Sequence, residues 1–286
     1  MAGEPLCALD YAVATGCETM QIFGKSPRRW AGPATDLKVA ADFRAACLCQ
    51  GVGPVFTHAS YLINMGAEGE ELWERSTAAL ADELTRAADL GASGLVIHLG
   101  RRHSDDDAGC VARVTDCIVR ASALAGDRCV PVLLENSAGA GRQFGVSIGE
   151  MAAAMVSVRE AGVETALCFD TCHGFAAGID VRTEEGWAAL LDELTGLAGP
   201  GAIRLIHAND CKGGFASHKD RHEWIGDGYI GAEGFAAMMR QPALDDSSVV
   251  VEMPGAGPHK DEENVRRLKS LRGDDAGSAG PGRERV

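Results

Sequence analysis

Seven short apolar segments, each followed by a stretch of helical character, recur along the chain at a nearly constant interval. They cover residues 19–23, 54–58, 95–99, 130–135, 166–170, 203–207 and 249–252. The spacing can be measured between residues at the ends of these segments, which are 23, 58, 98, 135, 170, 207 and 252. Successive ends are 35, 40, 37, 35, 37 and 45 residues apart. Strands that alternate with helices, without the turn residues of hairpins, indicate a parallel sheet. Since one strand–helix unit of a (β/α)8 TIM barrel takes roughly 30 residues before loop insertions, we predict this fold.

The helices between these segments can also be placed. Residues 70–90 and 187–197 carry apolar side chains at helical intervals, which predicts one helix over each range. Gly51, Gly91 and Gly162 stand where helices would end in a left-handed residue. Residues 6–15, ended by Gly16, are predicted to form the first helix.

The count of seven strands is one short of a closed barrel, and no strand precedes the first helix. One unit of about 35 residues before residue 23 falls outside the chain. We therefore expect an α/β barrel that lacks its first strand and exposes the edges of the strands on either side. On this basis we expect that the reading frame starts late or that the chain is unstable. One domain is expected over residues 1–272, followed by a disordered Gly/Asp-rich tail at 273–286.

Composition and charge restrict the class of protein. The chain has 286 residues, and its net charge is −14, which argues against gripping a nucleic acid by bulk positive charge. Apolar runs long enough to span a membrane and a secretory signal are both missing from the sequence, so we expect a soluble cytoplasmic protein. The ten cysteines are scattered, and we expect reduced thiols that pack as small apolar side chains.

Six of the seven segments end in a histidine or a carboxylate, and the carboxyl ends of parallel barrel strands share one rim. Two short motifs, at 170–173 and 220–222, add three more such residues. The nine candidates for metal ligands are His58, His98, Glu135, Asp170, His173, His207, Asp220, His222 and Glu252.

Each candidate alone has an ordinary structural explanation, such as a hydrogen-bonded histidine or a surface ion pair. Their coincidence at one rim favours a metal centre. Nine ligands are too many for one zinc ion, which takes about four, and would suit two or three ions that share carboxylates. Manganese or iron would also accept these ligands.

Charge arithmetic indicates the chemistry of such a centre. Four carboxylates contribute −4, and three divalent cations would leave the site near +2, attractive to a phosphate. Neighbouring divalent ions can activate water near neutral pH and stabilise a departing oxygen. The residues therefore predict metal-assisted hydrolysis of a phosphate ester.

The motifs around these residues are similar to those of one known family. They are Thr57-His58-Ala-Ser-Tyr61-Leu-Ile-Asn64, His98-Leu-Gly100, Leu134-Glu135-Asn-Ser-Ala-Gly139, Phe169-Asp170-Thr-Cys-His173, His207-Ala-Asn209-Asp210-Cys-Lys212, Asp220-Arg221-His222 and the glycine-rich run from Ile225 to Gly231. Together they resemble endonuclease IV, the apurinic/apyrimidinic (AP) endonucleases with a trinuclear zinc site on a TIM barrel. The resemblance runs from about residue 5 to residue 270.

The resemblance implies a role for each ligand. His58 and His98 would bind one zinc ion, and Glu135, the central catalytic carboxylate, would bridge it to a second. Asp170, His207 and Glu252 would complete the second ion, and a third would lie between His173, Asp220 and His222. The implied reaction is hydrolysis of the phosphodiester 5′ to an abasic site in duplex DNA, which leaves a 3′-hydroxyl and a 5′-deoxyribose phosphate. Removal of 3′-blocking groups and a monomeric state are also implied.

Two loops are expected to contact DNA. One carries Lys25, Arg28, Arg29 and Trp30, and the other carries Tyr61 and Leu62. In the family these loops enter the duplex, and an abasic nucleotide is cheaper to flip out because its base is missing.

Two other functions stay open at this point. A sugar isomerase or epimerase of the xylose-isomerase-like barrels would share the fold and some ligands, but does not need both Asp220-Arg221-His222 and His173. A DNA-damage binding protein without activity would keep the zinc ions and lack incision. Fold alone does not decide among these functions.

Overall fold

Seven parallel strands form one sheet that curls into a barrel in the computed structural model, which describes residues 4–104, 106–252 and 258–272. In spatial order they are β1 (Met20–Phe23), β2 (Val55–His58), β3 (Leu95–His98), β4 (Val132–Glu135), β5 (Thr165–Asp170), β6 (Ile203–His207) and β9 (Ser248–Val250). Each strand pairs in parallel with its neighbour in sequence order. The predicted barrel fold is confirmed.

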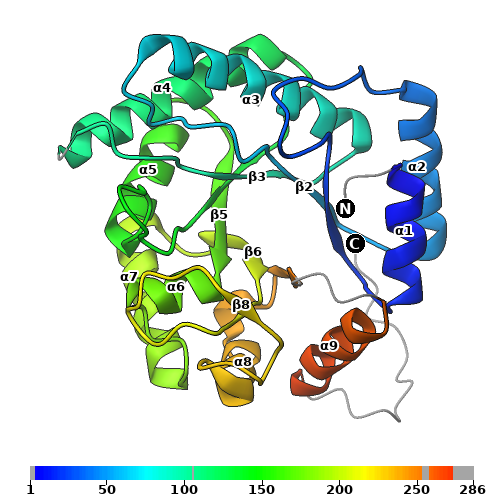
Figure 1. Cartoon of the computed structure of the whole chain (residues 1–286), viewed down its shortest axis with the longest axis vertical. Helices are drawn as coiled ribbons and strands as arrows, with labels where there is room; N and C mark the ends of the chain where they lie inside the picture. Colours follow the sequence, from blue (N-terminus) through cyan, green and yellow to red (C-terminus); the bar gives the residue numbers. More distant parts are fainter. Residues whose placement is uncertain (1–3, 105, 253–257, 273–286) are drawn as a thin grey trace.

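Helices surround the sheet on its outer side (Figure 1). They are α1 (Pro5–Ala14), α2 (Leu37–Gln50), α3 (Glu70–Leu90), α4 (Asp107–Ala125), α5 (Ile148–Glu160), α6 (Thr171–Ala177), α7 (Glu184–Ala198), α8 (Gly231–Met239) and α9 (Pro258–Leu271), with a 3-10 turn at Pro242–Leu244. The predicted helix over residues 70–90 is confirmed as α3, and α7 contains the one predicted over 187–197. Gly51 and Gly91 end α2 and α3 at φ +66° and +70°, as expected for left-handed caps.

One apolar layer fills the barrel directly below its carboxyl rim. It consists of residues that lie two positions before the polar strand ends, namely Phe56, Val96, Leu133, Cys168, Leu205 and Val250, together with Ala166. Since side chains alternate along a strand, a residue at this position faces the same side as the polar residue above it. The polar strand ends therefore lie directly on this buried apolar layer, which we call the floor.

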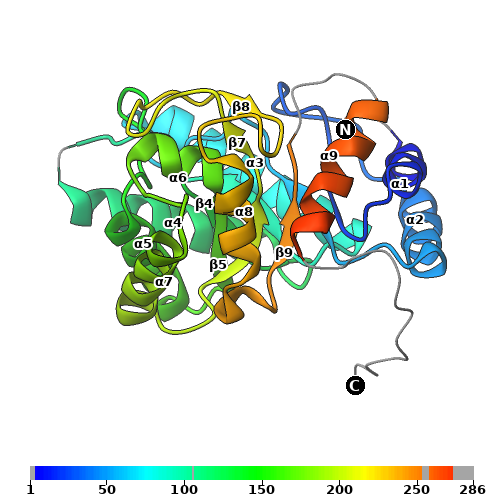
Figure 2. The ribbon, with the colours of Figure 1, turned by 90° about the horizontal axis from the view of Figure 1, so that it is seen from below.

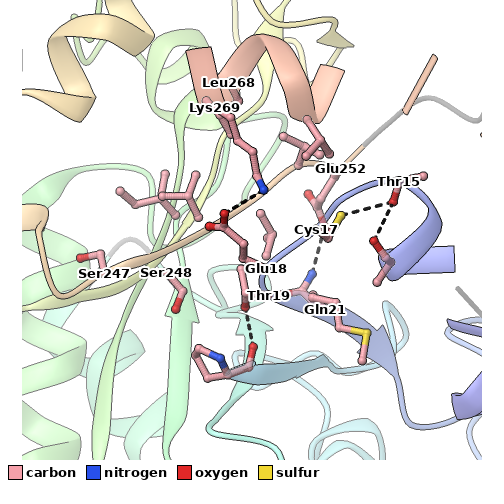
Figure 3. A pocket seen from close by; sticks show the side chains of 18 of the residues that line it. Thr15, Cys17, Glu18, Thr19, Gln21, Ser247, Ser248, Glu252, Leu268 and Lys269 are labelled. Atoms are coloured by element: carbon pink, nitrogen blue, oxygen red, sulfur yellow. Dashed lines mark hydrogen bonds and ion pairs between the residues drawn. The ribbon is translucent and has the colours of Figure 1, made fainter. Parts of the chain in front are cut away.

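The barrel is open between β1 and β9, which do not pair with one another in the described part of the chain. We name this gap the seam. A cavity of about 1010 Å³ occupies it, between α1 and β1 on one side and β9 and α9 on the other. Figure 3 shows the residues that line it, and Figure 2 shows α9 beside β9 and α1 on the outside.

Ion pairs join the two sides of the seam at the end away from the polar rim. Glu18, just before β1, accepts hydrogen bonds from Lys269 at 2.8 Å and from Arg272 at 2.9 Å. Nearby, the Tyr11 hydroxyl of α1 donates to Asp261 of α9. The hydrogen bonds of Arg272 and Lys269 outweigh the burial of Glu18 and lower its pKa to about 2.

Three expectations need correction or fall outside the structure. β9 ends at Val250, so Glu252 lies two residues beyond the strand instead of at its end. A hairpin that the sequence did not predict joins β7 (Asp210–Cys211) to β8 (His222–Glu223) in antiparallel fashion. The predicted disordered tail, 273–286, lies outside the described residues. All ten cysteines are free thiols, and six of them are buried as expected, whereas Cys7 and Cys49 are exposed and Cys17 and Cys129 are half-buried. None of the described helices is both long and apolar enough to cross a membrane.

We expect Glu18→Gln to destabilise the seam slightly. The loss at pH 7 should be no more than about 1 kcal/mol, because Glu18 is half exposed and solvent screens its ion pairs. A carboxyl with a lowered folded-state pKa stabilises the fold above its unfolded value of 4.5, and that contribution disappears as the pH falls towards 2. Urea unfolding of both proteins between pH 7 and pH 3 should therefore show a difference that shrinks with acid.

The matched control is Glu164→Gln, which removes an exposed ion pair with Arg204 away from the seam. A pH-independent difference for Glu18→Gln, or an equal and equally pH-dependent one for Glu164→Gln, would contradict the prediction.

Candidate metal centre

The sheet register brings the polar strand ends to one level of the barrel rim. His98 on β3 lies directly opposite Glu135 on β4. Asp170 on β5 lies opposite His207 on β6. Glu252 follows Val250, the partner of His207, by two residues, so the alternation of side chains turns it to the same inner face.

All nine predicted ligands come together in three adjoining groups, within each of which the ligand atoms lie no more than 4.8 Å apart. The groups are His58, His98 and Glu135; Glu135, Asp170, His207 and Glu252; and His173, Asp220 and His222. A fourth combination, Asp170, Cys172 and His222, overlaps with these. Glu135 belongs to the first two groups and connects them.

The Glu135 carboxylate is the centre of this arrangement. Its Oε2 lies 3.0 Å from Nε2 of His58 and 3.4 Å from Nε2 of His98. Its Oε1 lies 3.1 Å from Nδ1 of His207 and 3.4 Å from Nδ1 of His173. Only 1% of the side chain is exposed, so four imidazoles replace the water that an ionised carboxylate would otherwise have.

The third group combines a helix start with the β7–β8 hairpin. Asp170 caps α6 and accepts the backbone N–H of His173 at 2.7 Å, which fixes the two residues relative to each other. Nε2 of His173 lies 3.3 Å from Asp220, and Nε2 of His222 lies 3.2 Å from the same carboxylate. Asp220 is half exposed, so this group lies at the open edge of the site.

Electrostatics keep the carboxylates ionised despite burial. Burial disfavours the charged form of Glu135, but the charges of His98 and His207 outweigh it and hold its pKa well below the usual range. Burial also opposes ionisation of Glu252, yet the charge and hydrogen bond of His207 lower its pKa to about 2. Burial disfavours the charged form of His222, but the neighbouring carboxylates of Asp220 and Asp170 nevertheless raise its pKa to about 9.

These residues fit divalent cations. Ligand atoms about 2 Å from a shared zinc ion lie roughly 3–4 Å from one another, which is the spacing seen here. Nε2 of His222 is buried without a properly directed hydrogen bond, although it faces Asp170 at 3.6 Å and Asp220 at 3.2 Å. An imidazole nitrogen aimed at two carboxylates in this way has the surroundings of a metal ligand.

Two asparagines hold the carboxylates in place, and sequence reasoning missed both roles. Asn136 exchanges two hydrogen bonds with the backbone of Asp170, at 2.7 and 3.0 Å. Asn209 donates to the Asp170 carboxylate at 2.6 Å and to Glu252 at 3.3 Å, and accepts the backbone N–H of Glu252 at 2.8 Å. Both asparagines lie next to predicted ligands in the motifs, which is the one signal that pointed to them.

A buried aspartate organises the glycine-rich segment beyond the hairpin. Asp210 accepts the backbone N–H groups of Cys211, Gly226, Gly228, Ile230 and Gly231 at 2.8–3.4 Å. A Cβ atom at Gly228 would lie 2.6 Å from the Cys211 carbonyl, so only glycine lets the chain wrap this closely. Asp210 therefore anchors one strand of the hairpin whose other strand begins at His222.

The two loops expected to contact DNA are joined beside this centre. The Pro27 carbonyl accepts hydrogen bonds from the Ser60 hydroxyl at 2.8 Å and from the Tyr61 N–H at 3.1 Å. The Tyr61 ring is more than half exposed and lies 5.6 Å from the His58 ring. Arg28 and Arg29 are exposed, and Leu62 is half-buried. The two loops are therefore joined next to the first ligand group. We name the part of them that carries Arg28, Arg29, Tyr61 and Leu62 the ridge.

Two residues of these loops lie differently from expectation. The Lys25 side chain is 2% exposed, and its ammonium lies 2.7 Å from Asp82 and 3.1 Å from Glu83. These ion pairs neutralise its charge within the protein and attach the loop to α3. Trp30 is half-buried against the core under the Arg75 guanidinium, 4.3 Å from the ring centre.

We expect Asp210→Asn to loosen the glycine-rich segment. An amide in place of the carboxylate directs an NH₂ group at backbone donors, and the unsatisfied groups should cost about 2–3 kcal/mol. Hydrogen exchange should show faster exchange of amides 226–231. Asp227→Asn is the control, because Asp227 lies in the same segment but pairs with Arg267 at the surface. Equal protection of these amides in both variants would refute the role of Asp210.

Comparisons with known proteins agree with this architecture. The model of the xylose isomerase-like TIM barrel family matches residues 9–271. A probable endonuclease 4 from Methanoculleus marisnigri is 39% identical over 273 residues, which cover 96% of each protein. The endonuclease 4 of Thermus thermophilus is 39% identical over 264 residues, or 92% of each protein. A crystal structure of endonuclease IV from Thermus thermophilus matches with a TM-score of 0.84 and 37% identity, covering 96% of this chain and 97% of that one. The chain therefore belongs to the endonuclease IV family of xylose isomerase-like TIM barrels.

Proposed function

We propose that this chain is a metal-dependent DNA repair endonuclease that hydrolyses the phosphodiester 5′ to an abasic site. The products are a 3′-hydroxyl and a 5′-deoxyribose phosphate. The observation that carries this proposal is the convergence of five histidines and four carboxylates in three adjoining groups that share Glu135. Relatives named endonuclease 4 align over nearly the whole chain and support the same activity.

Three zinc ions are the cofactors that we propose, one for each ligand group. When bound, they supply Lewis acidity that activates the attacking water and neutralises charge on the departing oxygen. Glu135 holds the first two groups at a fixed separation, because its two oxygens face different pairs of histidines. The apolar floor, with Val96 and Leu133 fully buried, packs directly below the centre, and the cavity of the seam reaches the centre at Gln21 and Glu252.

The ridge made by the two joined loops is the proposed DNA-binding surface. Arg28 and Arg29 would contact phosphates, and Tyr61 with Leu62 would occupy the space of the displaced nucleotide. Hydrogen bonds from Ser60 and Tyr61 to Pro27 hold the two loops together, so the cations and the aromatic ring keep a fixed relation. This preorganisation reduces the entropy lost when the ridge enters the duplex.

The same centre would also remove 3′-blocking groups, since that reaction cleaves the same class of ester. One chain should suffice, because all nine ligands come from a single copy.

The test of this function is incision of a duplex that carries one tetrahydrofuran abasic analogue, with elemental analysis of the same preparation. The analogue resists β-elimination, so a product with a 3′-hydroxyl reports hydrolysis. We expect incision with close to three metal ions per chain. Glu135→Gln should reduce incision at least about 1000-fold, because it removes the carboxylate shared by two ligand groups.

Glu223→Gln is the matched control. Glu223 is a half-buried carboxylate on the same hairpin as His222, but it pairs with Lys212 and belongs to none of the ligand groups. A metal-loaded protein without incision contradicts the endonuclease. Sugar epimerisation by that protein would then identify an isomerase, and tight binding of the abasic duplex would identify a non-catalytic binder.

The double variant Arg28→Ala/Arg29→Ala should weaken binding of the abasic duplex about tenfold and flatten its dependence on salt. Each lost phosphate contact lowers the slope of log K against log salt concentration by about one. Binding titrations at several salt concentrations measure this slope. Arg204→Ala removes an exposed cation near the start of β6 that pairs with Glu164, and it should leave the slope unchanged. Equal effects of the two changes would exclude the ridge as the DNA-binding surface.

A further inference from the structure

Gln21 on β1 is a polar side chain that the proposed ligand set does not include, yet it reaches the ligands. Met20 and Ile22 pack into the apolar cluster below α1 and α2. Alternation along the strand turns Gln21 and Phe23 to the barrel interior, where the Phe23 ring lies 5.6 Å from the His58 ring. Gln21 thus lies opposite Phe56 of the apolar layer, directly below the metal centre, on the strand that borders the seam.

The Gln21 amide bridges the seam through two contacts. Its Oε1 lies 2.9 Å from Nε2 of His207 on β6. Its Nε2 lies 3.3 Å from Oε1 of Glu252, which follows β9. Figure 3 shows Gln21 pointing across the cavity toward Glu252. Backbone pairing between β1 and β9 is missing from the described residues, so this side chain links the two sides near the metal centre, as the ion pairs of Glu18 do at the other end.

The partners of the amide determine its orientation. The carboxylate of Glu252 can only accept, so the NH₂ end of the amide must face it. The carbonyl end then faces Nε2 of His207, and Nε2 must carry the hydrogen that it donates. An imidazole that binds a metal cation is neutral, so only one of its nitrogens is protonated and Nδ1 is left with a free lone pair.

That free nitrogen is the one that faces the other ligands of the second group. Nδ1 of His207 lies 3.1 Å from Glu135, 3.3 Å from Glu252 and 3.9 Å from Asp170. We propose that Gln21 is a positioning residue for the second metal ion. It fixes the tautomer of His207 that can bind a cation through Nδ1, and it holds Oε1 of Glu252 while Asn209 holds Oε2. This role rests on the proposed metal centre.

Glu252 needs such support more than Glu135 and Asp170 do. It lies beyond the last residue of β9, outside the ladder of strand hydrogen bonds that fixes Glu135 and Asp170. Its backbone N–H is bound by Asn209, and its two carboxylate oxygens receive one amide donor each, from Asn209 and from Gln21. Mutation of a residue that holds a metal ligand in this way typically lowers the affinity for the metal 10–100-fold.

The first experiment is long-range ¹H–¹⁵N NMR of the zinc-loaded protein labelled at histidine. In the wild type we expect His207 to carry its proton on Nε2, and a proton on Nδ1 would overturn the assignment. Gln21→Met keeps the length of the side chain and removes both hydrogen bonds. It should weaken retention of one metal equivalent about 10–100-fold against a chelator and broaden or shift the Nε2–H signal.

Two further variants separate positioning from loss of structure. Gln21→Glu keeps an acceptor for Nε2–H, so the tautomer signal should persist. Thr19→Val changes the residue just before the same strand and lines the same cavity without touching a ligand, and it should leave metal retention unchanged. If Gln21→Met retains metal as well as the wild type and keeps the same His207 tautomer, only this inference is overturned. If the wild type itself holds no metal, the proposed metal centre is overturned.

Discussion

The ionised carboxylate of Glu135, enclosed by four imidazoles, is the interaction on which the rest of the site depends. Its histidine partners come from β2, β3, α6 and β6, so this one side chain connects elements on opposite sides of the rim. Such a buried charge is tolerated only when opposite charges and hydrogen bonds surround it. The register of the parallel strands brings these partners together, because it pairs His98 with Glu135 and Asp170 with His207 on neighbouring strands.

Most of the centre could be predicted from the sequence because two simple periodicities determine it. The spacing of the strands fixes which residues share a rim, and the alternation of side chains fixes which of them face inward. These two rules placed His58, His98, Glu135, Asp170 and His207, all of which lie at strand ends. They were less accurate for Glu252, which lies past its strand and is held by Asn209 instead of by the sheet.

What the sequence did not reveal depends on contacts between distant segments. From its loop sequence, Lys25 is expected to be a free cation. Its charge is neutralised by Asp82 and Glu83, which lie almost 60 residues later in the chain, so only the structure shows this contact. Gln21 is not itself a typical metal ligand, and its place beside His207 follows from the curl of the sheet, which brings β1 close to β6 and β9 although the strands do not pair across the seam. In the sequence, nothing distinguishes Asp210 from the other acidic residues of the motifs. Its role follows from the structure, in which its carboxylate accepts hydrogen bonds from five backbone N–H groups.

The anchoring of the hairpin has a consequence for how this protein can vary. The chain that carries Asp220 and His222 is fixed at one end by β7 and at the other by the glycine-rich wrap around Asp210, largely through backbone groups. The exposed positions 214–216 are also attached to α6, because the Phe215 ring lies 5.4 Å from the Phe175 ring and the Ala216 N–H donates to the Phe175 carbonyl at 3.1 Å. A Cβ atom at Gly214 would meet no atom of the described residues within 4 Å beyond its chain neighbours. Substitution at this one position can therefore reshape the outer wall of the rim while the ligands stay in place, which makes it the natural entry point for altering substrate preference by evolution or by design.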